Sequence, residues 1–150
     1  MRHYETNSPQ ALARLLALAM LIDGMAEDVE YELLERSGVL GALGISRERL
    51  DSVLHELYQD MDLGTSMTRT LDQRLTAGDL SQLVGEVTDI GHQQALLLAM
   101  MRVAVANEQL SSGEARLIRE ALVQWTSDVG IGHQPLPANM PRRRLADRAA

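Results

Sequence analysis

The stretch SPQALARLLALAMLIDG, residues 8–24, decides the fold. Ser8 followed by Pro9 is typical of a helix start, because a serine side chain can cap free backbone N–H groups and proline fits the first helical turn. The apolar residues that follow recur at steps of three, one, three and one: Leu12, Leu15, Leu16, Ala19 and Met20. This pattern predicts a helix from Pro9 to about Ile22, with one face in a core.

Helical spacing continues through the chain, and no strand-like alternation persists. We expect further helices over about 28–43, 46–60, 80–87, 93–106 and 112–125, with short helical turns near 71–75. Gly38 is expected to kink the second helix and Gly44 to end it in the left-handed conformation, while Ser46 caps the third. The sequence therefore predicts an all-α protein, a single compact bundle of about six or seven helices.

The length of 150 residues, with 45% hydrophobic residues, fits one domain with a sizeable core. We expect residues 1–130 to form the helical domain. Residues 131–150 hold three prolines and four arginines, including Arg142–Arg144, and are expected to form a flexible tail.

Composition excludes several classes of function. The absence of cysteine excludes thiolate zinc sites, iron–sulfur clusters and a cysteine nucleophile. With no Phe, one Trp and three Tyr, a nucleic-acid surface built on stacked aromatic rings is not expected. The net charge is −7 and every cation is an arginine. Such an acidic body repels nucleic acid and anionic lipid, and favours cations or basic partners.

The first residues do not form an export signal, because the polar residues 5–9 separate Arg2 from the first apolar run. That run, residues 11–22, carries Arg14 and is too short to span a bilayer. We therefore expect no direct membrane insertion and a cytoplasmic location.

Two segments match when the chain is shifted by 84 residues: LAMLIDGMAEDVEYELL, residues 18–34, and RVAVANEQLSSGEARLI, residues 102–118. In each, an apolar helix is followed by Asp23 or Asn107, then six residues, then Glu30 or Glu114. The glutamate falls in the first turn of the next helix, beside the positive end of its dipole. The pattern predicts two related helical hairpins.

This pair of hairpins resembles the TerB-like family, named for bacterial tellurite-resistance operons. That family carries an Ala-Asp-Gly motif, five further residues and Glu at a helix–loop–helix, commonly twice in one all-helical domain. Asp23, Gly24 and Glu30 match the first copy. The second copy keeps Glu114, but Asn107 and Glu108 stand in place of Asp-Gly. The resemblance covers about residues 9–128.

The resemblance implies a role in tellurite resistance and in wider chemical-stress or phage-defence systems. It implies partners among other proteins of such operons, including an inner-membrane one. It also implies a site for a divalent cation, Ca²⁺ or Mg²⁺, on clustered acidic residues.

Oxygen ligands of the kind that Ca²⁺ and Mg²⁺ prefer occur in both loops. The candidate metal ligands are Asp23, Glu27, Glu30, Asn107, Glu108 and Glu114. The same residues have a second interpretation, because Ser111-x-x-Glu114 is a capping-box pattern and Glu27 or Asp28 can cap the matching helix. The calcium-loop pattern of EF-hands is absent, since the position that needs glycine is Asp28 and the one that needs glutamate is Leu34.

No catalytic motif is present. His55-Glu56 resembles half of a zinc-protease motif, but the position of the second histidine is Gln59. We therefore expect a non-enzymatic protein without catalytic residues or a nucleic-acid partner. Two alternatives stay open: a metal-dependent hydrolase that uses the same acidic loops, and a purely structural interaction module. The sequence does not indicate an oligomeric state.

Overall fold

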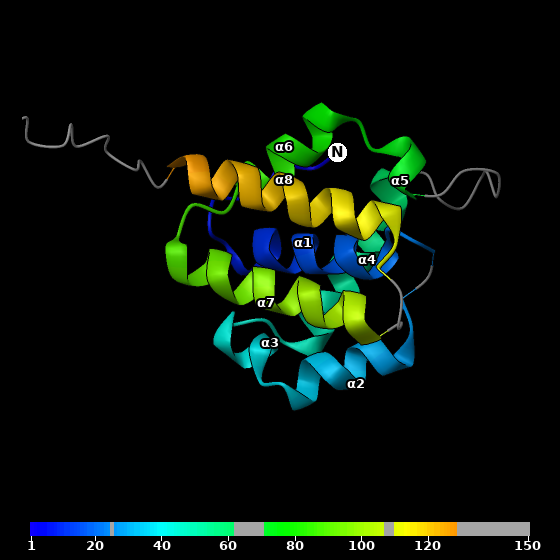
Figure 1. Ribbon diagram of the computed structural model, residues 1–150. Coiled ribbons are helices and arrows are strands. Elements are labelled where there is room, and N and C mark those ends of the chain that lie inside the picture. Colours follow the sequence, from blue (N-terminus) through cyan, green and yellow to red (C-terminus); the bar gives the residue numbers. More distant parts are fainter. Residues whose placement is uncertain (25, 62–70, 107–109, 129–150) are drawn as a thin grey trace, which may run out of the picture.

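The computed structural model describes residues 1–24, 26–61, 71–106 and 110–128. Within these ranges the chain forms helices and no strand (Figure 1), so the all-α prediction is confirmed. The helices are α1 (Pro9–Leu21), α2 (Asp28–Arg36), α3 (Val39–Ala42), α4 (Arg47–Asp60), α5 (Leu71–Arg74), α6 (Ala77–Gly85), α7 (Ile90–Ala106) and α8 (Ser112–Asp128). Among the described residues, no helix is long and apolar enough to cross a lipid bilayer.

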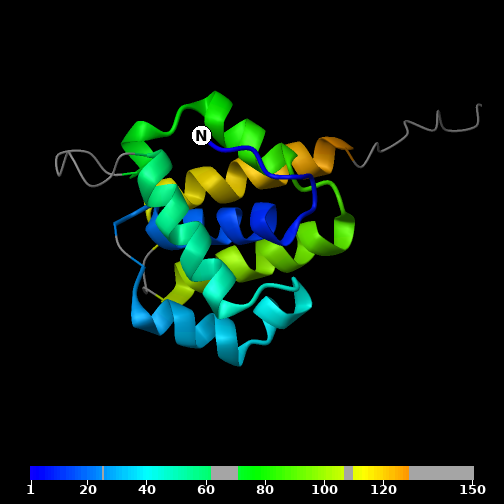
Figure 2. The ribbon, with the colours of Figure 1, turned by 180° about the vertical axis from the view of Figure 1, so that it is seen from behind.

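Helix α1 forms the centre of the bundle. Every residue from Ala11 to Ile22 is buried. Figures 1 and 2 show α1 between α7 and α8 on one side and α4 on the other. The helix begins as predicted, because the Ser8 hydroxyl oxygen accepts the N–H of Ala11 at 3.2 Å and Pro9 occupies the first turn. Burial on all sides goes beyond the single inward face that the sequence pattern predicted.

The predicted caps at Ser46 and Gly44 are present, but α6 begins three residues before the expected residue 80, and one expected helix is divided in two. Ser46 caps α4 through the N–H of Arg49 at 3.2 Å, and Gly44 has a φ of +65°. The single helix expected over residues 28–43 is wrong. Gly38 has a φ of +70°, a left-handed conformation that interrupts a helix rather than bending it. The chain therefore forms α2 and α3 as separate helices.

The second repeat begins with α7, which packs against α1, the first helix of the other repeat. The small residues Ala19 and Ala99 are both buried. Helix α7 starts at Ile90, three residues earlier than expected, because the Asp89 carboxylate accepts the N–H of His92 at 2.9 Å. The proposed boundary at residue 130 and the tail beyond it lie outside the described residues.

Arg14 of α1 forms a buried ion pair with Glu86. Arg14 is 2% exposed, and its guanidinium donates to the carboxylate of Glu86 and to the carbonyl of Arg2. It also lies 4.3 Å from the centre of the Tyr4 ring. Asn7 ties the first residues to the same region, since its N–H donates to the Glu86 carbonyl at 2.8 Å. A buried charge is stable only when it is paired in this way.

Candidate functional site

Described residues that flank the two predicted loops lie together at one end of the bundle. Gly113, at the start of α8, packs against Ile22, at the end of α1. A Cβ atom on Gly113 would lie 2.9 Å from Ile22 Cγ1 and 3.2 Å from Asp72 Cβ. Figures 1 and 2 both show the ends of α1 and α7 and the starts of α2 and α8 at this end. We call Asp23, Glu27, Glu30 and Glu114 the acidic end.

In the first loop, one acidic residue turns inward and the others face solvent. Glu30 is 1% exposed, and its Oε2 accepts the N–H of Glu27 at 2.8 Å. Glu27 is the N-cap residue of α2, one of the two capping residues that the sequence suggested. Asp23, Glu27 and Asp28 are exposed. The first copy is thus a helix cap with exposed carboxylates around it.

The second loop repeats this arrangement around Glu114, which is 2% exposed. Its Oε2 accepts the N–H of Ser111 at 2.8 Å, and the Ser111 hydroxyl oxygen accepts the N–H of Glu114 at 3.1 Å. The predicted capping box is therefore confirmed. The other carboxylate oxygen, Oε1, is buried and has no hydrogen-bond partner in the described part of the chain.

The structure places the six candidate metal ligands unevenly. Glu30 and Glu114 are buried at the same end of the bundle, whereas Asp23 and Glu27 lie on the surface. Asn107 and Glu108 lie outside the described residues. Within the described residues, no group of three or more acidic or histidine side chains is arranged to hold a metal ion. The cation site stays a prediction, and capping already accounts for the positions of the two buried glutamates.

A second feature lies on α7, which is apolar on two opposite faces. The inner face carries the buried residues Leu96, Ala99, Met100 and Val103. The outer face carries Leu98, Met101 and Val105, which are 49%, 55% and 75% exposed. Their spacing of three and four residues places them on one side of the helix. The second apolar stripe can be found in the sequence, and it was the available signal that one face of α7 is open.

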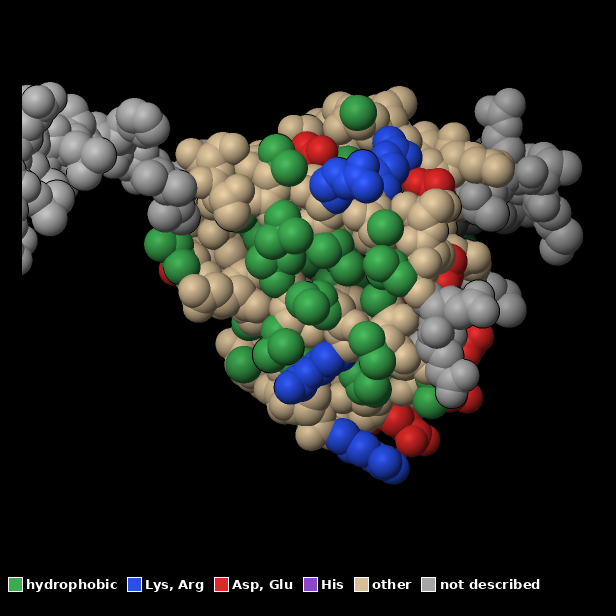
Figure 3. Space-filling view, in the orientation of Figure 1, with side chains coloured by type: hydrophobic (Ala, Val, Ile, Leu, Met, Phe, Trp, Pro, Cys, Tyr) green, Lys and Arg blue, Asp and Glu red, His purple; other side chains and the backbone are tan. Residues whose placement is uncertain are grey.

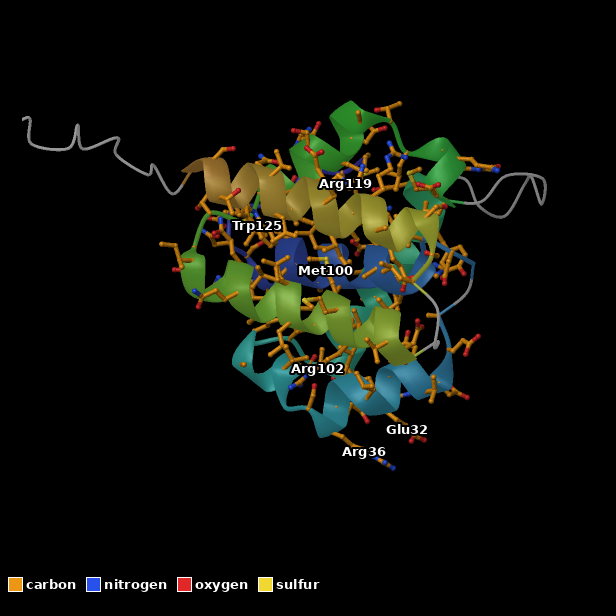
Figure 4. All side chains as sticks on the ribbon, viewed as in Figure 1. Glu32, Arg36, Met100, Arg102, Arg119 and Trp125 are labelled. Carbon is orange, nitrogen blue, oxygen red and sulfur yellow. The ribbon has the colours of Figure 1, made fainter. Side chains whose placement is uncertain are left out.

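Helix α8 extends this surface. Leu122 is exposed, and Figure 3 shows a broad apolar area over α7 and α8 with arginines on two sides. Figure 4, in the same view, labels Arg119 on α8 and Arg102 on α7. We call Leu98, Met101, Val105 and Leu122 the α7–α8 face.

A groove of about 560 Å³ lies beside this face, between α2 and α7. Val29, Leu33 and Ala106 supply apolar walls, and Arg102 lines its α7 side. Glu32 and Arg36 of α2 also line the groove, with 3.4 Å between the Arg36 Nη2 and Glu32 Oε2 atoms; Figure 4 labels both on α2. The groove and the α7–α8 face are therefore two apolar surfaces on either side of Arg102.

Comparisons with models of protein families, with curated proteins and with solved structures find no match. The acidic end and the α7–α8 face are therefore the features of this chain that bear on its function.

Proposed function

We propose that this chain is a non-enzymatic interaction module that binds another protein through the α7–α8 face. The open apolar stripe of α7 carries this proposal. A helix that is apolar all round is normally enclosed by other helices. A contiguous exposed apolar surface with polar surroundings is typical of a protein-binding site.

We propose further that the module is TerB-like and acts in a cytoplasmic stress-response system such as tellurite resistance. Its partners would be proteins of the same system, including one in the inner membrane. The matching residues Asp23, Gly24 and Glu30 support this proposal, together with the second copy around Glu114 and the all-helical fold. A metal-dependent hydrolase has weaker support, because both buried glutamates already use an oxygen to cap a helix.

A comparative pull-down from the native cell tests the interaction function. Leu98→Ser with Met101→Ser removes two apolar side chains from the face, and both are exposed enough for the fold to survive. Tyr58→Ser is the matched control, since Tyr58 is exposed on α4, which Figure 2 shows on the opposite side.

We expect specific partners to bind the parent and Tyr58→Ser and to be lost from the double variant. Circular dichroism and melting curves check that all three proteins fold. Equal capture by the folded double variant would show that the α7–α8 face is not the binding surface.

A second proposal concerns a divalent cation at the acidic end, which would modulate binding. The specific observation in its favour is Glu114 Oε1, a buried carboxylate oxygen without a hydrogen-bond partner among the described residues. A buried carboxylate is costly unless a positive charge or a donor compensates it. Glu30 is buried at the same end, and Asp23 lies on the adjoining loop. Ca²⁺ or Mg²⁺ would provide the missing charge.

Melting curves in chelator and in millimolar Ca²⁺ or Mg²⁺, with titration calorimetry, test this second proposal. A cation at a hundredfold excess over its dissociation constant should stabilise the parent by about 2.7 kcal/mol. Asp23→Asn with Glu30→Gln should abolish this response, whereas Glu48→Gln on α4 should retain it. If neither cation changes the melting temperature of the parent protein, no such site exists. The two glutamates then act only as helix caps.

A further inference from the structure

The charge around the α7–α8 face is opposite to that of the whole chain. The chain carries a net charge of −7, yet α7 has no acidic residue and its one charged residue is Arg102. Arg119 borders the face on α8, as Figures 3 and 4 show. Among the described residues neither arginine forms an ion pair, whereas Arg116 on the same helix lies 3.1 Å from Asp72. The face is therefore an apolar area between two cations that form no ion pair within the described part of the chain.

We propose that the α7–α8 face binds an amphipathic helix of another protein, whose apolar stripe is flanked by Asp or Glu side chains. This inference rests on the proposed function and names the chemistry of the partner. Helices recognise such surfaces through apolar residues three and four positions apart. Carboxylates beside that stripe would reach Arg102 and Arg119, and a guanidinium can bind a carboxylate through two parallel hydrogen bonds.

Charge complementarity excludes a second copy of this chain as the best occupant. In a two-fold pairing the same surface lies on both sides of the interface. The cations of one copy would then face the cations of the other, because the face offers no carboxylate. Glu32, the acidic residue nearby in the groove, lies 3.4 Å from Arg36 and is already paired.

The end of the chain is excluded by the same argument. Residues 130–150 carry four arginines against one acidic residue, Asp147. Like charges placed together at an interface oppose binding, so this segment has the wrong sign for a face bordered by Arg102 and Arg119. The complementary occupant is an acidic helix from elsewhere.

Binding of three synthetic peptides to the full chain tests the proposal by fluorescence polarisation. The peptides have about 18 residues, enough for partial helix formation. They share one stripe of leucine and methionine at helical spacing and differ only in the flanking residues, which are all Glu, all Gln or all Lys. We expect the Glu peptide to bind about tenfold more tightly than the Gln peptide, and the Lys peptide to bind most weakly. The difference should shrink as salt is added.

Charge reversal on the protein sharpens the test. Arg102→Glu with Arg119→Glu should invert the order, so that the Lys peptide binds best. Arg49→Glu is the control, because Arg49 is exposed on α4, away from the face. Leu98→Ser with Met101→Ser should weaken all three peptides, since it removes the apolar contacts that they share.

Several outcomes would overturn the acidic-helix proposal: no binding of the Glu peptide, no preference over the Lys peptide, or no response to charge reversal. A preference for the Gln or Lys peptide that still depends on Leu98 and Met101 would leave the protein-binding function standing and remove the acidic partner. Sedimentation of the parent completes the test. A dimer lost in Leu98→Ser with Met101→Ser would identify a second copy as the occupant and overturn the proposal.

Discussion

Helices α1 and α7 have similar sequences and different surroundings. Each is almost wholly apolar and carries one charged residue, Arg14 in α1 and Arg102 in α7. Helix α1 is enclosed by its neighbours and its arginine is paired with Glu86. Helix α7 is enclosed on one side, and its arginine borders an open apolar face. A high apolar content therefore predicts that a helix packs against other helices. The structure shows whether those helices belong to this chain.

The strongest test of this comparison is a pair of identical substitutions. Leu16→Ala in α1 removes a fully buried side chain and should lower the free energy of unfolding by about 4 kcal/mol. Leu98→Ala on the outer face of α7 should change it by less than about 0.5 kcal/mol. Urea denaturation at neutral pH measures both. A large loss for Leu98→Ala would mean that the outer face of α7 is covered within the isolated chain.

The second largest expected change in stability concerns Arg14, which is paired with Glu86. Glu86→Ala leaves Arg14 buried without its carboxylate and should cost about 3 kcal/mol. Arg14→Met with Glu86→Leu removes both charges and should cost much less, because apolar side chains suit that environment. Equal losses for the single and the double variant, again from urea denaturation, would show that the charge pairing is unimportant.

The helices that follow α1 and α7 should respond alike to loss of their caps. Glu30→Ala in α2 and Glu114→Ala in α8 each remove the carboxylate that accepts a cap N–H, at an expected cost of about 1–2 kcal/mol. The measurement is a thermal melt in chelator, so that no cation contributes. Glu120→Ala on α8 is the control outside the cap. A cost confined to one copy would contradict the structural equivalence of the two hairpins.

Tyr4, which lies over Arg14, provides the smallest effect. Burial and a hydrogen bond to Glu56 raise the pKa of Tyr4 to about 12 from its usual 10.0. Folding favours the neutral phenol, so the resulting stability is complete below pH 10 and is lost as the pH rises towards 12. Burial and Asp51 also raise the pKa of Tyr31.

Tyr4→Phe should therefore reduce the loss of stability between pH 10 and pH 12 without abolishing it. Urea midpoints across that range measure the loss, with Tyr58→Phe as the control, because Tyr58 is an exposed tyrosine on α4. A parent and a Tyr4→Phe variant with the same alkaline slope would show that the phenol does not contribute to folding.

Local patterns in the sequence predicted the helices well, because capping and periodicity act over a few residues. Ser8, Ser46 and the Ser111–Glu114 box cap helices as expected. The effect of Gly38 was predicted as a kink within one helix, whereas its left-handed conformation separates two helices. The pairing of Arg14 with Glu86 was missed, because 72 residues separate them and no local pattern connects them.

The candidate site was predictable only in part, because it also depends on contacts between residues far apart in the sequence. The repeat indicated that the two loops are related, but the contact of Gly113 with Ile22 depends on tertiary packing between residues far apart in the sequence. The outer face of α7 is exposed because no described helix of this chain packs against it. Side-chain periodicity identifies two apolar stripes and does not determine which one faces inward.

The central position of α1 has a consequence for the order of events during synthesis. Three of the helices that pack against it, α4, α6 and α7, follow it in the chain, and α7 ends 85 residues after Leu21. At about 5–20 residues per second, a ribosome needs roughly 4–17 seconds to make that stretch. Until α7 is complete, the most apolar part of the nascent protein is only partly covered. Chaperones that hold emerging apolar segments should therefore engage residues 11–22, and release should follow completion of α7.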